Sequence, residues 1–67
     1  MEISDIIGNK IKRLRIKKGF TQEELSVKLD IAREHLNKIE NGKAHPGIVL
    51  VIKIRKIFKT KYEDILP

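Results

Sequence analysis

The sequence predicts a small all-α domain of five helices, and three observations support this prediction. Apolar residues recur every three or four positions along most of the chain, which is the spacing that buries one face of a helix. Capping residues and glycines divide these runs into short segments. The chain has 67 residues and no cysteine, so one compact core must form without disulfides or thiolate-bound metal. We therefore expect one domain over residues 1–67.

The first expected helix has Ile3, Ile7, Ile11 and Leu14 spaced to share one face, and Gly19 is placed to end it. The segment after Pro46 is almost entirely apolar and predicts the fourth helix. A capping-box spacing from Thr60 to Glu63 predicts a short last one. The expected boundaries, in chain order, are about 4–18, 22–29, 32–41, 48–58 and 61–66.

The middle of the chain carries the strongest local signals. Thr21 can cap the helix that follows, Glu24 can close a capping box with it, and Phe20 can pack as a hydrophobic staple on Leu25. Asp30 can adopt the left-handed conformation that a tight turn between two helices needs. Residues 21–41 therefore predict two short helices held at a fixed angle, a helix-turn-helix.

Several segments in register resemble the Cro/repressor-type helix-turn-helix proteins, also called the XRE family. The matching pieces are Leu14-Arg15, Gly19, the run from Thr21 to Leu29, Ile39-Glu40-Asn41-Gly42, Pro46, the apolar helix at 48–58, and Glu63-Asp64-Ile65. The match runs without gaps over residues of about 11–66. The resemblance implies a five-helix repressor-like DNA-binding domain.

Charge independently indicates an anionic partner. Fifteen Lys and Arg against nine Asp and Glu give a net charge of +6, and a pI near 9.8 is typical of a nucleic-acid-binding domain. The alternative is a set of solvated basic helix faces. The longest apolar run, residues 48–52, is far below the roughly 20 residues of a membrane span, and no signal peptide is recognisable. We expect a cytoplasmic protein.

The base-reading residues are expected on the outer face of the segment 32–41, opposite Leu36 and Ile39. The candidates are Arg33, Glu34, Asn37 and Lys38. Arg33 can donate two hydrogen bonds to guanine, and Asn37 can read adenine or simply face solvent. Glu34 can accept from cytosine or orient a neighbouring basic side chain.

Phosphate contacts are expected where the N-terminus of the second helix presents free N–H groups, at Thr21 and Gln22. The resemblance assigns a phosphate contact to Gln22 and a second contact region to Asn41 and Lys43. It also implies a largely buried salt bridge between Arg15 and Glu40, whose alternative is two exposed charges.

Four positions depart from the family pattern. Asp30 replaces the usual turn glycine, and Ala32 replaces a Ser or Thr that caps the third helix, so this cap should be absent. His35 replaces a small hydroxyl residue and is expected to be packed or solvated, the alternative being a contact to a phosphate. Arg55 stands where the family has Ala, and the sequence gives no firm account of it beyond snorkelling or pairing with an acid.

The helix at 48–58 carries more apolar surface than one core needs. Ile48, Val51, Ile52 and Phe58 form one inward face on a helical wheel, which leaves several apolar residues outside it. We expect the surplus to form a homodimer interface together with the C-terminal residues. The alternative is that the last helix covers these side chains within one chain. The expected interface residues are Leu50, Ile54, Ile57, Tyr62, Ile65 and Leu66.

The sequence thus predicts a sequence-specific DNA-binding transcriptional regulator, most simply a repressor, that binds a palindromic operator in double-stranded DNA as a homodimer. The alternative is an antitoxin or another protein-interaction module on the same fold, with a toxin or co-regulator as partner. A nonspecific nucleic-acid chaperone is a third reading.

An enzyme is not expected, since His35 and His45 lie on different elements and neither serine has an obvious base partner. We expect no cofactor and no metal, because the histidines lack ligand spacing.

Overall fold

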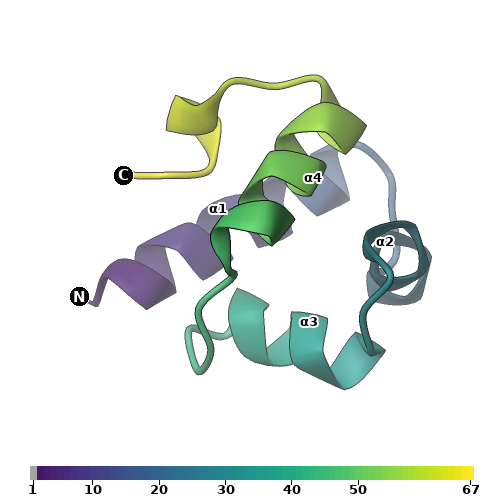
Figure 1. Ribbon diagram of the computed structural model, residues 1–67, viewed down its shortest axis with the longest axis horizontal. Helices are drawn as coiled ribbons and strands as arrows, with labels where there is room; N and C mark the ends of the chain where they lie inside the picture. The colour runs from purple at the N-terminus through teal and green to yellow at the C-terminus, as the bar shows by residue number, and fades with distance from the viewer. Residues whose placement is uncertain (1) are drawn as a thin grey trace.

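The computed structural model describes residues 2–67 and is all-helical over them. The elements are α1 (Ile3–Lys17), α2 (Gln22–Leu29), α3 (Arg33–Glu40), α4 (Ile48–Phe58) and one 3-10 turn, η1 (Tyr62–Asp64). In Figure 1, α1 and α4 cross near the centre, α2 lies at the right, and α3 forms the lower edge. No helix in residues 2–67 is long and apolar enough to cross a membrane.

The predicted capping box at the start of α2 is confirmed. The backbone N–H of Glu24 donates to Thr21 Oγ1 at 3.0 Å, and the backbone N–H of Thr21 donates to Glu24 Oε1 at 2.9 Å. Two of the helix's unpaired N–H groups are therefore satisfied by short local contacts. Helix α3 has Ala32 at the corresponding position and has no side-chain cap, as its missing hydroxyl predicts.

All four α-helices end in the same way, with one residue in the left-handed conformation. These residues are Gly19, Asp30, Gly42 and Lys59, with φ values of 80°, 57°, 76° and 51°. At each end, this residue and the next donate their backbone N–H groups to carbonyls in the last helical turn. Glycine adopts this conformation at little cost, whereas Asp30 and Lys59 carry a Cβ that makes it less favourable.

One core holds the helices together, and every α-helix contributes to it. Its buried apolar residues are Ile7, Ile11, Leu25, Leu29, Leu36, Ile39, Leu50, Val51, Ile54, Phe58 and Ile65. The Phe20 ring packs against this core, with its centroid 5.7 Å from that of Phe58. The helix-turn-helix is therefore not free-standing, because α1 and α4 supply the surface on which α2 and α3 are packed.

Helix α1 approaches the backbone of α3 closely at Gly8, which is buried. A Cβ built at this position would collide with the carbonyl oxygen of Ile39 and lie 3.0 Å from that of Glu40. The absence of a side chain at Gly8 thus sets the distance between α1 and the C-terminal turn of α3.

The expected fifth helix over residues 61–66 is not an α-helix, because the segment after α4 forms only the single 3-10 turn η1. The expected cap also differs. The carboxylate of Asp64, not that of Glu63, accepts from the Thr60 hydroxyl and from the Lys61 backbone N–H, the latter at 3.1 Å. A turn of three residues is too short to bury a helical face, so this segment is held by individual contacts.

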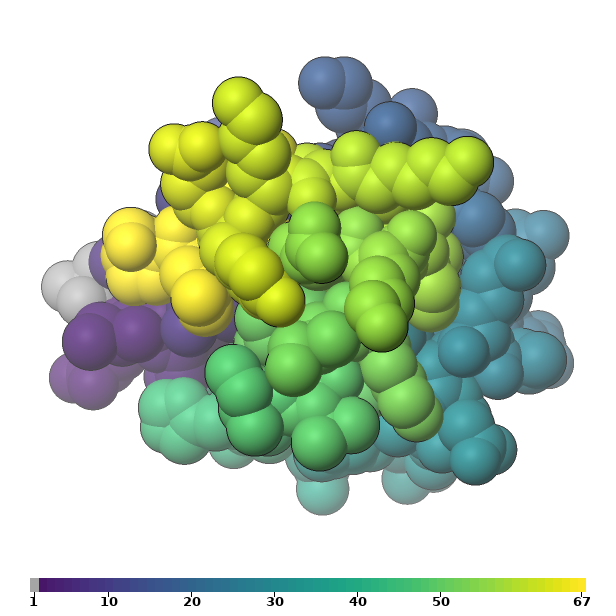
Figure 2. Space-filling model, turned by 45° about the horizontal axis from the view of Figure 1, so that its top comes forward, coloured from purple at the N-terminus to yellow at the C-terminus, as the bar shows by residue number. Residues whose placement is uncertain are grey.

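Lys10 on α1 supplies two of these contacts. Its ammonium group donates to the carbonyl oxygens of Glu63 and Leu66, both at 3.0 Å. Helix α4 supplies a further contact, since the guanidinium carbon of Arg55 lies 4.8 Å from the centroid of the Tyr62 ring. Figure 2 shows α4 in green and the C-terminal segment in yellow beside each other on one face.

The predicted inward faces of two helices need correction. On α4, Leu50 and Ile54 are buried together with Val51 and Phe58, whereas Ile48 is 69% exposed. The buried face of α4 is therefore rotated about the helix axis relative to the predicted one. A helix with apolar residues on all sides has no unique apolar stripe from which its buried face could be predicted. On α1, Ile3 is 61% exposed, since it lies in the first turn, beyond the reach of the core.

Candidate nucleic-acid interface

The outer face of α3 presents a row of polar side chains to solvent. Leu36 and Ile39 are completely buried, and they fix the rotation of the helix about its axis. The four predicted base-reading residues Arg33, Glu34, Asn37 and Lys38 are all exposed. Together they offer a guanidinium, a carboxylate, an amide and an ammonium group on the solvent side of one helix. Helix α3 itself lies at the lower edge of the molecule in Figure 1.

The residues proposed for phosphate lie at both ends of the helix-turn-helix. Thr21 is exposed at the N-cap of α2, and Gln22 is half-buried in the first turn. Asn41 and Lys43 are exposed just after α3. Gln22 and Asn41 are each hydrogen-bonded to Asn37, so residues of both regions adjoin the exposed face of α3.

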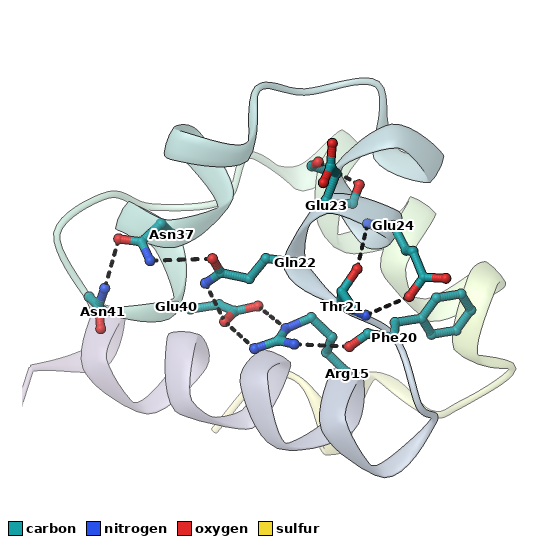
Figure 3. A network of polar contacts seen from close by, with 10 residues as sticks. Arg15, Phe20, Thr21, Gln22, Glu23, Glu24, Asn37, Glu40 and Asn41 are labelled. Atoms are coloured by element: carbon teal, nitrogen blue, oxygen red, sulfur yellow. Dashed lines mark hydrogen bonds and ion pairs between the residues drawn. The ribbon is translucent and has the colours of Figure 1, made fainter.

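Arg15 and Glu40 form a largely buried ion pair between α1 and α3 (Figure 3). Arg15 Nε donates to Glu40 Oε2 at 2.8 Å, and Arg15 Nη2 donates to Oε1 at 3.1 Å. The side chains are 11% and 1% exposed, respectively. A third donor, Nη1, bonds the carbonyl oxygen of Phe20 at 2.9 Å. One guanidinium thus joins α1, the segment before α2, and α3.

A chain of side-chain amides continues from this ion pair to the outer face of α3. Gln22 Nε2 donates to Glu40 Oε1 at 3.1 Å, and Asn37 Nδ2 donates to Gln22 Oε1 at 3.4 Å. Asn41 Nδ2 then donates to Asn37 Oδ1 at 3.0 Å. The structure therefore brings Gln22, Asn37 and Asn41, which are candidates on different elements, into one continuous network (Figure 3).

The structure shows the surroundings of His35 and Arg55, two positions that depart from the family pattern. His35 is exposed on α3. Arg55 lies over the Tyr62 ring, and its Nε is buried with no hydrogen-bond partner in residues 2–67. Arg55 therefore serves the packing of the C-terminal segment, a role that only the three-dimensional contact with Tyr62 reveals.

Three residues of the predicted dimer interface are not surface residues. Ile54 and Ile65 are completely buried within the chain, and Leu50 is 9% exposed. All three belong to the core of the single chain, to which the C-terminal segment contributes Ile65, so they are covered within one chain. This is the intramolecular alternative that the sequence allowed. Of the predicted set, Tyr62 remains 43% exposed, while Ile57 and Leu66 are half-buried.

These features define a class of protein. Two short helices joined by a left-handed turn are locked on a small core, and the second of them presents exposed hydrogen-bonding groups. This is the geometry of a helix-turn-helix nucleic-acid-binding domain, in which the second helix enters the major groove.

Sequence comparison gives the family. A family model described as Helix-turn-helix matches residues 11–65. The chain is 44% identical over 57 residues to an uncharacterized HTH-type transcriptional regulator of Methanocaldococcus jannaschii, covering 85% of this chain and 86% of the relative. It is 39% identical over 57 residues to the uncharacterized regulator YgzD of Bacillus subtilis, with the same two coverages. The protein belongs to the helix-turn-helix family of the XRE type, whose members are DNA-binding transcriptional regulators.

Solved structures agree with the fold. The restriction-modification controller protein C.AhdI from Aeromonas hydrophila superposes with a TM-score of 0.85 at 21% identity, covering 94% of this chain and 96% of that one. The clp gene regulator ClgR from C. glutamicum gives 0.88 at 18% identity, covering 97% and 84%. At these identities the likeness concerns the fold alone.

Proposed function

We propose that this protein is a sequence-specific transcriptional regulator that places α3 in the major groove of double-stranded DNA. The observation that supports this most directly is the outer face of α3. Its four exposed polar residues are backed by two fully buried ones, so the reading groups are held on a fixed surface. A protein that bound nucleic acid without preference would need only positive charge there, yet Glu34 is exposed among them.

The proposed reading chemistry follows from the side chains. Arg33, in the first turn of α3, donates its planar pair of N–H groups to guanine O6 and N7. Asn37 pairs with adenine, and Lys38 adds a donor to a base or a neighbouring phosphate. Glu34 accepts from the amino group of cytosine. Each good bidentate contact contributes about 1–3 kcal/mol of discrimination against the wrong base.

The proposed affinity comes from the DNA backbone. Thr21 and Gln22 lie at the N-terminus of α2, where free N–H groups favour a phosphate, and Asn41 and Lys43 follow the C-terminal end of α3. The net charge of +6 strengthens attraction to any duplex. These contacts position α3 and carry no sequence information of their own.

We propose further that the regulator binds as a homodimer to a palindromic operator and represses by occluding RNA polymerase. The support is an apolar surface on α4 that the core leaves uncovered. Val49 and Ile48 on α4 are 64% and 69% exposed, and Tyr62 in the C-terminal segment is 43% exposed. A two-fold pair of reading helices matches two half-sites one helical turn apart.

The test is a selection of bound sequences from a randomised DNA pool, carried out with the wild-type protein, Arg33→Ala and Lys61→Ala. We expect a palindromic consensus for the wild type and a loss of preference at one base of each half-site in Arg33→Ala. Lys61→Ala removes the same charge from the C-terminal segment and should keep the consensus. Failure to recover any consensus would contradict the proposal and favour a protein-interaction role, such as that of an antitoxin.

A further inference from the structure

The amide chain beside the ion pair has a defined direction, because it starts at a group that can only accept. The Glu40 carboxylate accepts from Arg15 at both oxygens, and it is 1% exposed. The Gln22 side chain must therefore present its NH₂ group to Glu40, and its oxygen faces the other way. The orientation of this amide is fixed by chemistry and needs no choice between its two flipped forms.

The orientation of the Gln22 amide in turn determines the orientation of the Asn37 amide on α3. Since the Gln22 oxygen can only accept, Asn37 must present its NH₂ group toward α2. The Asn37 oxygen then faces Asn41, which donates to it at 3.0 Å. Three successive amides are thus oriented from one buried carboxylate, and the middle one lies on the exposed face of α3 (Figure 3).

Asn37 keeps the capacity to bind a base in this arrangement. Its NH₂ group has a second hydrogen, and its oxygen has a second lone pair. An asparagine reads adenine by donating to N7 while accepting from the N6 amino group. A fixed amide direction presents donor and acceptor in a single order, so no binding energy is spent in choosing between two orientations.

We propose that Asn37 is a specificity-determining residue for adenine and that Gln22 is the positioning residue that orients it, using Glu40 as its anchor. This inference rests on the proposed function of α3 as a DNA reader. It assigns Gln22 a role in base preference in addition to a phosphate contact, which its second N–H leaves possible. A purely phosphate-binding Gln22 would affect all sequences equally.

The first test measures binding to the selected operator and to operators changed at the adenine read by Asn37. The variants are Asn37→Ala, Gln22→Met, which keeps the length of the side chain, and the double variant. Lys43→Met serves as a matched control, because it removes another proposed phosphate contact from the same region. Thermal unfolding of each variant verifies that it is folded.

We expect the wild type to prefer adenine by about tenfold or more, and Asn37→Ala to lose this preference. Gln22→Met should lose most of the preference at the same base and at no other. The double variant should show the same adenine preference as Asn37→Ala alone, although the lost phosphate contact of Gln22 weakens its binding to all operators. Lys43→Met should weaken binding to all operators evenly. An even loss of affinity in Gln22→Met, with the adenine preference intact, would overturn the inference.

The second test needs no DNA. In the free protein, the side-chain amide resonances of Asn37 in ¹H–¹⁵N spectra should move in Gln22→Met and stay in place in Lys43→Met. Unchanged Asn37 resonances in Gln22→Met would overturn the orienting step while leaving the proposed function standing. A wild type without any consensus would instead overturn the proposed function and this inference together, so the two failures are distinguishable.

Discussion

At the scale of single residues, backbone strain is concentrated at two helix ends. Lys59 and Asp30 adopt left-handed conformations that glycine occupies at the ends of α1 and after α3. An L residue pays roughly 1–2 kcal/mol for this conformation, although Asp offsets part of it through local hydrogen bonding. The two positions therefore stabilise the fold less than a glycine would.

We predict that Lys59→Gly raises the free energy of unfolding by about 0.5–1 kcal/mol, because relief of the left-handed strain exceeds the added entropy of the unfolded chain. Asp30→Gly should give a smaller gain. Denaturant unfolding measures both. A loss of stability in Lys59→Gly, as expected for glycine inside a helix, would show that Lys59 is not left-handed in solution.

The capping box of α2 makes the stability of the folded protein depend on pH. The pKa of Glu24 is held below its usual range, chiefly because the backbone N–H of Thr21 donates to the carboxylate. The unfolded chain then binds the proton more readily than the folded chain does. Stability contributed by Glu24 is therefore fully present above the ordinary glutamate pKa of about 4.3 and is lost as the pH falls through the lower folded pKa.

We predict that Glu24→Gln flattens the acid limb of the stability curve, since Gln retains an acceptor but does not titrate there. The free energy of unfolding, measured by urea between about pH 3 and pH 7, should fall less steeply for the variant below about pH 4.5. Asp64, whose pKa is lowered chiefly by the Thr60 hydroxyl, continues to titrate in both proteins and cancels from the difference. Parallel curves would contradict this account.

At the scale of elements, the close crossing of α1 and α3 depends on Gly8. We predict that Gly8→Ala destabilises the protein by about 1–3 kcal/mol, because its Cβ meets the backbone carbonyl of Ile39 rather than a movable side chain. Helix propensity alone predicts the opposite, a gain of about 1 kcal/mol. Thermal or denaturant unfolding decides between the two signs.

The matched control for that prediction is Asn9→Ala, at the neighbouring exposed position of α1. It makes the helix more favourable without any collision, so stability should stay the same or rise slightly. Equal effects of the two substitutions would mean that α1 does not approach α3 closely at Gly8.

The sequence predicted the helix-turn-helix well because the ends of its helices are determined by residues close together in the sequence. Thr21 and Glu24 form a cap through residues three apart, and Asp30 ends α2 by its own backbone conformation. Helix α4 was harder, since apolar residues surround it and only the neighbouring elements decide that Ile54 is buried and Ile48 is not. Local periodicity contains no information about those neighbours.

The candidate site shows the same limit. The outward direction of Arg33 follows from the buried positions of Leu36 and Ile39, which spacing alone predicts. The bond from Asn37 to Gln22 joins residues fifteen positions apart on two helices. Such a contact depends on the crossing of α2 and α3 and leaves no local pattern in the sequence.

At the scale of the whole molecule, α4 carries an apolar surface, at Ile48 and Val49, that the core leaves exposed. We predict a homodimer that Val49→Lys converts to a monomer, because a charge at the centre of an apolar interface is costly to bury. Val27→Lys places the same charge at a residue on α2 that is 74% exposed and should leave the dimer intact. Sedimentation equilibrium measures both, and dimers of equal strength in the two variants would exclude this surface.

We propose that this small basic domain reads DNA sequence and does not merely bind the charge of the duplex. The most direct measurement is the affinity of the wild-type protein for the selected operator and for a scrambled duplex of equal composition, at several salt concentrations. We predict that both affinities fall with salt, while the operator stays tighter by about 10³-fold or more throughout. Equal affinities for the two duplexes at every salt concentration would contradict the account.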